Sequence, residues 1–299
     1  MPPLAASALG IAISLDLLLE EPPTRLHPVA WFGAAIQPMD RPWSNPLLVG
    51  FGIAGIAPIL AGAVVGLTVW ASLNLHPALG VIVAGLVLFT TCSLRMLVTV
   101  ASAVIETSAT DIEQARSTLP ALVGRNPSTL STHLVRSAAI ESLAENLSDG
   151  FAGPLLAFAL GAQVSLAIGV GAAAWVKAVN TLDSMLGYRS KPIGVASARL
   201  DDVVMWLPAR VTAVAIAIAA RNPLAVLKAQ SWARNPASPN AGWPMATMAT
   251  VLAVRLEKPG AYVLNPAASP PTSKDGDRAV RLVAIAGFVL VFIVGVVVW

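Results

Sequence analysis

Two stretches without charged residues constrain this chain more than any other feature of its sequence. Residues 47–70 and residues 282–299 contain no Asp, Glu, Lys or Arg. A helix needs about 20 apolar residues to cross the hydrocarbon core of a bilayer, and both stretches approach or exceed that length. The whole chain agrees, with 56% hydrophobic and only 12% charged residues. We therefore predict an integral membrane protein with a transmembrane helix at each stretch.

Four further segments are apolar enough to be helices in or near the membrane. Residues 79–104 form a third candidate span, in which Arg95 should face protein or reach the interface. Residues 1–19 lack a basic start and a cleavage site, so we expect a retained helix. Residues 211–220 are short and favour a core or partly inserted helix.

The fourth segment, residues 151–176, is interrupted by Gly-Ala-Gln at 161–163. It forms either one crossing or a hairpin. A single crossing would move the basic residues of 177–210 to the outside, so the positive-inside rule favours the hairpin. Together the segments predict an all-α, polytopic membrane protein with about 4–6 membrane-inserted helical segments. We expect a single membrane-embedded domain over residues 1–299.

The distribution of basic residues predicts the orientation in the cell membrane. The connection at residues 71–78 lacks Lys and Arg, whereas the flanking loops hold Arg25, Arg41, Arg116 and Arg125. By the positive-inside rule those loops are cytoplasmic. The net charge of +3 is not concentrated in any run of five or more like charges, so we expect contact with lipid and no nucleic acid.

Three polar runs interrupt the apolar chain, at residues 139–150, 177–188 and 197–210. Ionisable groups near lipid cost a few kcal/mol each, which implies a use for them. The first run forms the C-terminal part of a predicted helix. Asn126 would cap the start of this helix, and Gly150 would mark its end. Within it, Glu141 and Glu145 continue an apolar stripe and should point inward, although a solvated face is an equally weighted alternative.

The second and third runs place Lys177, Asn180 and Asp183 about one turn apart, and Arg199 three residues before Asp202. Such pairs also occur as simple intrahelical ion pairs. One shared polar cavity facing the cytoplasm explains all three runs better. His27 and Asn240 lie in loops, where each is either a ligand contact or an ordinary loop residue.

The motifs of phosphate loops, dinucleotide-binding turns, zinc proteases and serine hydrolases are absent from the sequence. What remains is carboxylates, amides, Lys and Arg, the side chains that bind Mg²⁺ and phosphates. This set fits a membrane-embedded polar site in either an enzyme or a transporter.

The order of several motifs goes further: LHPVAWFG, VGRN, ESLAENLSDGFAGPL, AVNTLDSMLGY, ARLDDVVMWLPARVTA and SPNAGWPMA. It resembles the CobD/CbiB family of cobalamin biosynthesis, the adenosylcobinamide-phosphate synthases, over nearly the whole chain. The sequence departs from the family pattern at three places. Glu21 precedes Pro22 where the family usually has Asp, Asn126 replaces an aspartate, and Asn235 stands where a histidine is frequent.

The resemblance implies an ATP-dependent ligase that joins a propionate carboxylate of adenosylcobyric acid to 1-aminopropan-2-ol or its O-phosphate. ATP and Mg²⁺ would be the co-substrate and cofactor. Other late-pathway corrinoid enzymes and a second copy of the chain are possible partners. A transport or accessory protein with a polar cavity is the rival class.

On this resemblance we assign site residues in three groups. The catalytic candidates are Glu141, Glu145, Asp183 and Asp202. The metal ligands are Glu145, Asp149, Asp201 and Asp202. The substrate and phosphate contacts are His27, Arg125, Asn146, Lys177, Asn180, Arg199, Arg210 and Asn240.

Overall fold

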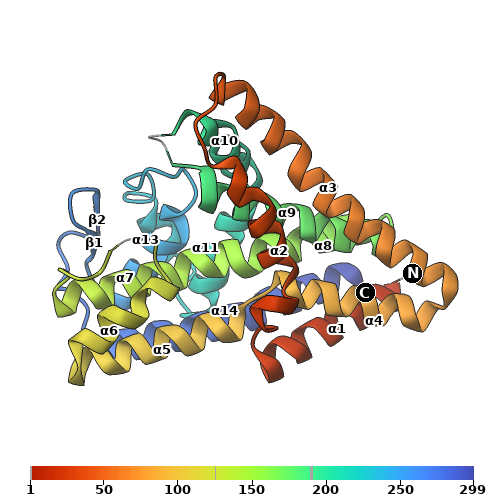
Figure 1. The fold of residues 1–299 in the computed structure, drawn as a ribbon. Helices are drawn as coiled ribbons and strands as arrows, with labels where there is room; N and C mark the ends of the chain where they lie inside the picture. The colour runs from red at the N-terminus through yellow and green to blue at the C-terminus, as the bar shows by residue number, and fades with distance from the viewer. Residues whose placement is uncertain (1, 125, 189–190) are drawn as a thin grey trace. The chain divides into compact units, whose positions relative to one another are not determined.

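The computed structural model describes residues 2–124, 126–188 and 191–299, and nearly all of its regular structure is helical (Figure 1). The all-α membrane fold predicted from the sequence is confirmed. The chain separates into two units, each assembled from segments distant in sequence. Unit 1 comprises Met1–Ser93, Asp149–Met205 and Phe292–Trp299, and unit 2 comprises Leu94–Ser148 and Trp206–Val291. That the two units together form one membrane-embedded domain stays a prediction.

Unit 1 contains the long apolar helix and the helices that carry two of the polar runs. Its elements are α1 (Pro2–Leu19), η1 (Thr24–Leu26), α2 (Pro28–Ile36), η2 (Gln37–Met39), α3 (Pro46–Leu75), α4 (Pro77–Thr91), α8 (Gly153–Ala162), α9 (Leu166–Leu186), η5 (Pro192–Gly194) and α10 (Val195–Val204). Ser165 caps α9 by accepting a hydrogen bond from the Ile168 N–H.

The predicted break at residues 161–163 is confirmed, because α8 ends there and α9 returns along it. A Cβ on Gly169 would stand 3.0 Å from the Phe158 carbonyl oxygen, so the two backbones need glycine to approach this closely. The helix α9 packs equally closely on α3, where a Cβ on Gly62 would stand 2.8 Å from the Gly171 oxygen. These contacts fix the position of the polar end of α9 within unit 1.

Unit 2 contains α5 (Leu94–Thr110), α6 (Ile112–Thr118), η3 (Leu119–Ala121), α7 (Thr132–Leu147), α11 (Trp206–Ala219), α12 (Ala225–Ala229), α13 (Gly242–Leu252), β1 (Leu256–Lys258), β2 (Tyr262–Leu264) and most of α14 (Ser273–Val298). The helices α5 and α14 run side by side (Figure 1), with Gly276 against Ile105 and Gly287 against Leu94. The strands β1 and β2 form an antiparallel hairpin that the sequence did not predict.

Three helical runs in the described part of the chain are long and apolar enough to cross a membrane: Pro46–Leu75, Pro77–Thr110 and Ser273–Val298. A fourth arises if Pro192–Val204 and Trp206–Ala219, bent by 48°, form one broken span. The predicted spans at 47–70 and 282–299 are confirmed as long apolar helices. The third is interrupted, since Cys92 is extended between α4 and α5.

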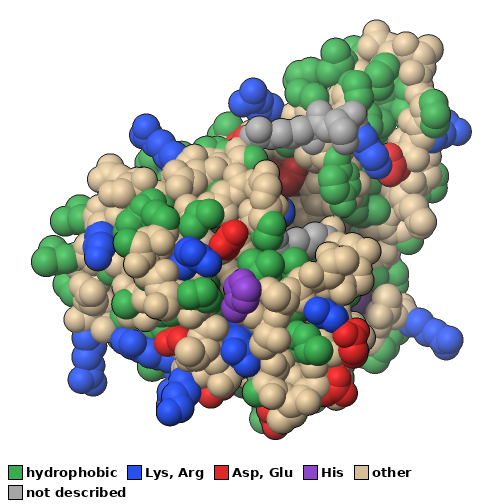
Figure 2. All heavy atoms as spheres, turned by 90° about the vertical axis from the view of Figure 1, so that its left-hand side faces the viewer, with side chains coloured by type: hydrophobic (Ala, Val, Ile, Leu, Met, Phe, Trp, Pro, Cys, Tyr) green, Lys and Arg blue, Asp and Glu red, His purple; other side chains and the backbone are tan. Residues whose placement is uncertain are grey.

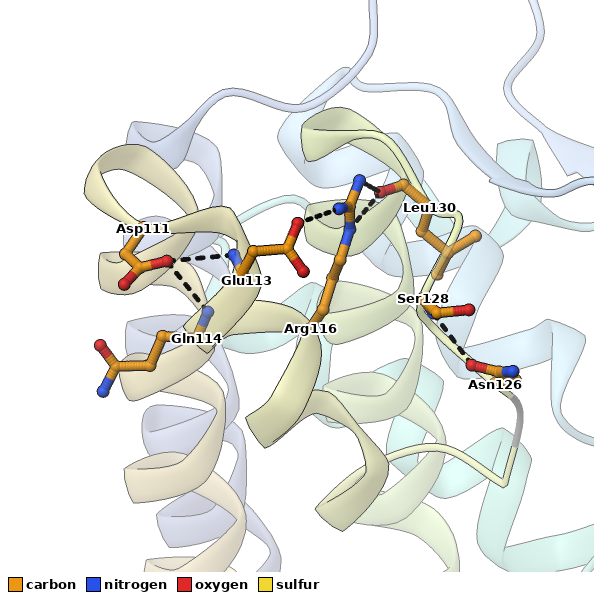
Figure 3. Close-up of polar contacts among 7 residues, drawn as sticks. All are labelled: Asp111, Glu113, Gln114, Arg116, Asn126, Ser128 and Leu130. Carbon is orange, nitrogen blue, oxygen red and sulfur yellow. Dashed lines mark hydrogen bonds and ion pairs between the residues drawn. The ribbon is translucent and has the colours of Figure 1, made fainter.

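The predicted start of the helix at residues 126–150 is wrong. Asn126 accepts a hydrogen bond from the Ser128 N–H at 3.0 Å and so closes a turn, while α7 begins at Thr132 (Figure 3). Arg116 holds the end of this turn, because its Nε donates to the Leu130 oxygen at 2.9 Å. Asparagine caps a local turn as readily as a helix, so its presence alone does not mark the start of a helix.

The predicted stop at Gly150 is also wrong. The α-helix gives way to a π-helical turn at Ser148–Ala152, and the chain continues directly into α8. A Cβ on Gly150 would meet the Ser93 Oγ at 3.0 Å. The glycine therefore serves a close approach to a neighbouring segment rather than a helix end.

Candidate functional site

The polar end of α9 faces α10 in unit 1 and brings together four residues predicted for the site. The Asn180 side-chain amide donates to the Asp201 Oδ1 at 3.5 Å. One turn further along α9, the half-buried Asp183 faces the charge of Asp202. These contacts confirm that the second and third polar runs meet.

The carboxylate of Asp183 lacks the compensation that buried charges normally have. Its Oδ1 is buried and has no hydrogen-bond partner among the residues that the structure describes. Burial, followed by the negative charge of Asp202, raises the pKa of Asp183 to about 6. Both effects penalise the ionised form, and a bound cation would relieve both.

Glycine at position 187 makes the space for this carboxylate. A Cβ there would stand 1.7 Å from the Asp183 Oδ1 and 2.6 Å from the Asp183 backbone oxygen. No side chain larger than hydrogen fits beside Asp183 in this arrangement. The absence of a side chain at position 187 therefore leaves room for the Asp183 Oδ1 at the end of α9.

Among the residues that the structure describes, no three His, Cys, Asp or Glu side chains lie close enough to hold a metal alone. Magnesium is usually held by one or two carboxylates together with substrate phosphates. The pair Asp183 and Asp202 fits that mode. The metal set predicted from the sequence stays a prediction.

A second polar site in unit 1 is a cavity of about 290 Å³ at the start of α2, lined by Glu21, Pro22, Thr24, His27, Val29, Ala30 and Lys177. His27 caps α2, since its Nδ1 accepts a hydrogen bond from the Val29 N–H at 3.2 Å. Its Nε2 lies 3.8 Å from the Glu21 Oε2. The pKa of His27 is lowered from its ordinary value, mainly by burial. The negative charge of Glu21 opposes this shift, and the positive charge of Lys177 adds to it.

In unit 2, Glu141 lies at the centre of a hydrogen-bonded network. It is only 4% exposed, as the stripe on α7 predicted. Ser137 donates to its Oε1 at 2.7 Å and Tyr262 donates to its Oε2 at 2.8 Å. The same Ser137 oxygen accepts the Glu257 N–H at 2.6 Å. This network ties the β1–β2 hairpin to α7.

Arg210 and Asn240, predicted separately, are also in contact within unit 2. The Arg210 Nη1 donates to the Asn240 side-chain oxygen, and its Nη2 donates to the Pro239 oxygen at 3.2 Å. The guanidinium lies 4.8 Å from the ring centre of Trp206 and 5.0 Å from that of Trp243. These contacts order the loop before α13.

The other predicted residues take no part in the hydrogen bonds given above. Arg199 is exposed on α10, and the Asn146 amide donates to the Leu122 oxygen at 3.4 Å. Glu145 and Asp149 are half-buried. Arg125 lies outside the described residues. The convergence of Glu141 and Glu145 with Asp183 in one cavity therefore stays a prediction.

Sequence reasoning missed three residues that the structure places beside predicted ones: Glu21, Ser137 and Tyr262. Glu21 had a usable signal, because it lies six residues before His27 at the family's Asp-Pro position. Tyr262 is one of only two tyrosines, but nothing in its local sequence connects it with Glu141. Only folding brings these two residues together.

Charged side chains are scattered on the face drawn in Figure 2. Lys and Arg lie apart from one another there, among uncharged side chains and acidic groups. The expectation that the protein does not bind nucleic acid stays a prediction.

Comparison with known proteins gives a consistent result. The model of the CobD/CbiB protein family matches residues 9–289. A probable cobalamin biosynthesis protein CobD of Methanothermobacter thermautotrophicus is 36% identical over 95% of this chain and 94% of its own length. The cobalamin biosynthesis protein CobD of Rhodobacter capsulatus is 36% identical over 98% of both chains. The probable CobD of Pyrococcus abyssi is 37% identical over 97% of this chain and 96% of its own. No solved structure matches.

Proposed function

The chain belongs to the CobD/CbiB family of cobalamin biosynthesis proteins, and on that premise we propose that it is a ligase that forms an amide bond. The acid is a propionate carboxylate of adenosylcobyric acid. The amine is 1-aminopropan-2-ol or its O-phosphate, and ATP drives the reaction. The product is adenosylcobinamide or its phosphate.

The reaction needs activation because a carboxylate is a poor electrophile. In the proposed sequence the propionate attacks the γ-phosphorus of ATP and ADP leaves. The amine then attacks the acyl carbon, loses a proton and displaces phosphate. Mg²⁺ would supply the charge that offsets the phosphate oxygens.

The observation that best supports this proposal is the pair Asp183 and Asp202. A fold gains nothing from a buried carboxylate oxygen that has no hydrogen-bond partner and lies near a second negative charge, whereas a site for Mg²⁺ and phosphate needs carboxylates. Asn180 positions Asp201 beside this pair through its hydrogen bond. Lys177, Arg199 and Arg210 remain the proposed phosphate contacts, and Glu145 and Asp149 remain proposed ligands.

We further propose that the protein lies in the cell membrane with this site on the cytoplasmic side. ATP and the corrinoid acid are charged and polar molecules, and both would reach the site from the cytoplasm. The basic loops predicted to be cytoplasmic support this orientation.

The test is an assay with the full-length protein purified in detergent. Adenosylcobyric acid, the amine, ATP and Mg²⁺ are supplied, and the amide product is detected by mass together with ADP and phosphate. We expect product in amounts equal to the ADP released. Corrinoid binding without ADP or amide would instead favour the transport or accessory class.

A further inference from the structure

The cavity at the start of α2 has the size of a small ligand. Its volume is about 290 Å³. This is near the lower end of the range for ligand pockets. The cavity therefore suits a small molecule rather than a corrinoid.

Lys177 supplies positive charge on one side of this cavity. Its side chain also lines a neighbouring apolar cavity with Phe32 and Val87, so its stem lies in apolar surroundings while its ammonium can reach the polar cavity. The ammonium makes no ion pair with any residue in the described part of the chain. A half-buried ammonium of this kind is stabilised when an anion binds.

The start of α2 adds to this anion-binding character. Val29 and Ala30, in the first turn of the helix, line the cavity. The partial positive charge of the helix N-terminus therefore faces the same space as Lys177. The two features are independent, since they come from different helices.

Glu21 adds a negative charge to the lining of the same cavity. The His27 Nδ1 accepts a hydrogen bond, so the neutral ring carries its proton on Nε2, which faces the Glu21 carboxylate. His27 therefore lies beside Glu21 without adding a charge of its own. An anion alone would be repelled by Glu21, whereas a molecule with a positive and a negative group could interact favourably with both Glu21 and Lys177.

We propose that this cavity is the subsite for the amine substrate, in which Glu21 binds its ammonium and Lys177 binds an anionic group at its other end. This proposal rests on the proposed function for the identity of the amine, but the binding itself does not require turnover. It assigns to Lys177 the selection of a phosphorylated amine over a free one.

Calorimetry on the full-length protein in detergent tests the proposal, with 1-aminopropan-2-ol O-phosphate and 1-aminopropan-2-ol as probes and neither ATP nor corrinoid present. Lys177→Met should weaken binding of the phosphorylated amine about tenfold or more and change binding of the free amine less than twofold. The control Lys228→Met removes an equal charge at an exposed position on α12 and should change neither.

Glu21→Gln provides a second variant whose folding is not at risk, because its side chain is 32% exposed. It should weaken binding of both amines at least about fivefold. Wild-type binding of the phosphorylated amine by Lys177→Met, or of both amines by Glu21→Gln, would overturn the proposal. Ligase activity with an unchanged KM for the amine in both variants would likewise reject the subsite while leaving the ligase function intact. The expected binding pattern without any ligase activity would support the subsite and reject the ligase.

Discussion

Asp183 on α9 and Glu141 on α7 are both carboxylates that the sequence predicted for the site, yet their surroundings are opposite. Glu141 in unit 2 is 4% exposed and accepts hydrogen bonds from Ser137 and Tyr262. Asp183 in unit 1 is less buried, but its Oδ1 has no hydrogen-bond partner among the described residues and its neighbour Asp202 repels it.

The contrast separates two uses of buried charge. A carboxylate that accepts hydrogen bonds from its own fold stabilises that fold, and here it holds a hairpin to a helix. A partly buried carboxylate that lacks a hydrogen bond to one oxygen and lies near another negative charge destabilises the fold and is typical of a binding site. The comparison thus favours unit 1 as the location of the proposed Mg²⁺-dependent reaction.

The largest expected effect comes from Asp183→Asn. Asparagine keeps the shape of the side chain but removes the charge that would bind Mg²⁺, so ligation should fall at least about 100-fold. Thermal stability should be unchanged or higher because the repulsion from Asp202 is lost. Amide formation is measured at saturating Mg²⁺ and ATP. Near-wild-type turnover by the folded variant would place Asp183 outside the site.

Gly187→Ala tests the same carboxylate without changing it. The new Cβ would overlap the Asp183 Oδ1, so the end of α9 must shift. We expect a loss of about 1–3 kcal/mol of stability and a fall in ligation of about tenfold or more.

The control is Gly55→Ala on α3, where nothing lies within 4 Å of the added Cβ. A helix-interior alanine should be neutral or stabilise the protein by up to about 1 kcal/mol. Equal behaviour of the two variants would show that the space beside Asp183 is not required.

Glu141→Gln should act mainly on stability. The amide weakens the charge-assisted bonds from Ser137 and Tyr262, and we expect a loss of about 1–3 kcal/mol in thermal or denaturant unfolding. Tyr262→Phe removes one of these bonds and should cost about 1 kcal/mol. Activity per folded molecule should fall less than tenfold. A stable Glu141→Gln protein without activity would reverse the comparison and make Glu141 the catalytic group.

The smallest effect is a pH dependence of stability. The pKa of Asp183 is raised from 3.8 to about 6, so the folded state binds this proton more tightly than the unfolded state does. The stabilisation from this proton is complete below about pH 4 and is lost as the pH rises through about 6. After allowance for solvent screening, the change is on the order of 1 kcal/mol.

Melting curves of wild type and Asp183→Asn at several pH values measure this difference. The asparagine variant should gain on wild type between pH 4.5 and pH 7.5. A constant difference over this range would mean that Asp183 titrates normally.

The sequence predicted the membrane helices because they need only length and an absence of charge. It also predicted the α8–α9 hairpin, since a Gly-Ala-Gln break and the basic loops were sufficient. The starts and stops of α7 were wrong because Asn126 and Gly150 each satisfy a turn or a close contact as well as a helix end.

For the site, the prediction of one shared polar cavity placed Asp183 near the residues of α10, and helical spacing predicted the burial of Glu141. It did not distinguish their environments, because the hydroxyl of Tyr262 reaches Glu141 from 121 residues away in the sequence. Hydrogen bonds over such separations depend on tertiary structure. Residue type and spacing therefore found the carboxylates but not which of them the fold itself satisfies.

The most direct test of this distinction is the thermal shift produced by Mg²⁺ and ATP in three proteins: wild type, Asp183→Asn and Glu141→Gln. A ligand that binds only the folded state raises its melting temperature. The account predicts that Mg²⁺ with ATP raises the melting temperatures of wild type and Glu141→Gln by similar amounts and leaves that of Asp183→Asn unchanged. An equal shift in Asp183→Asn, or the loss of the shift in Glu141→Gln alone, would contradict it.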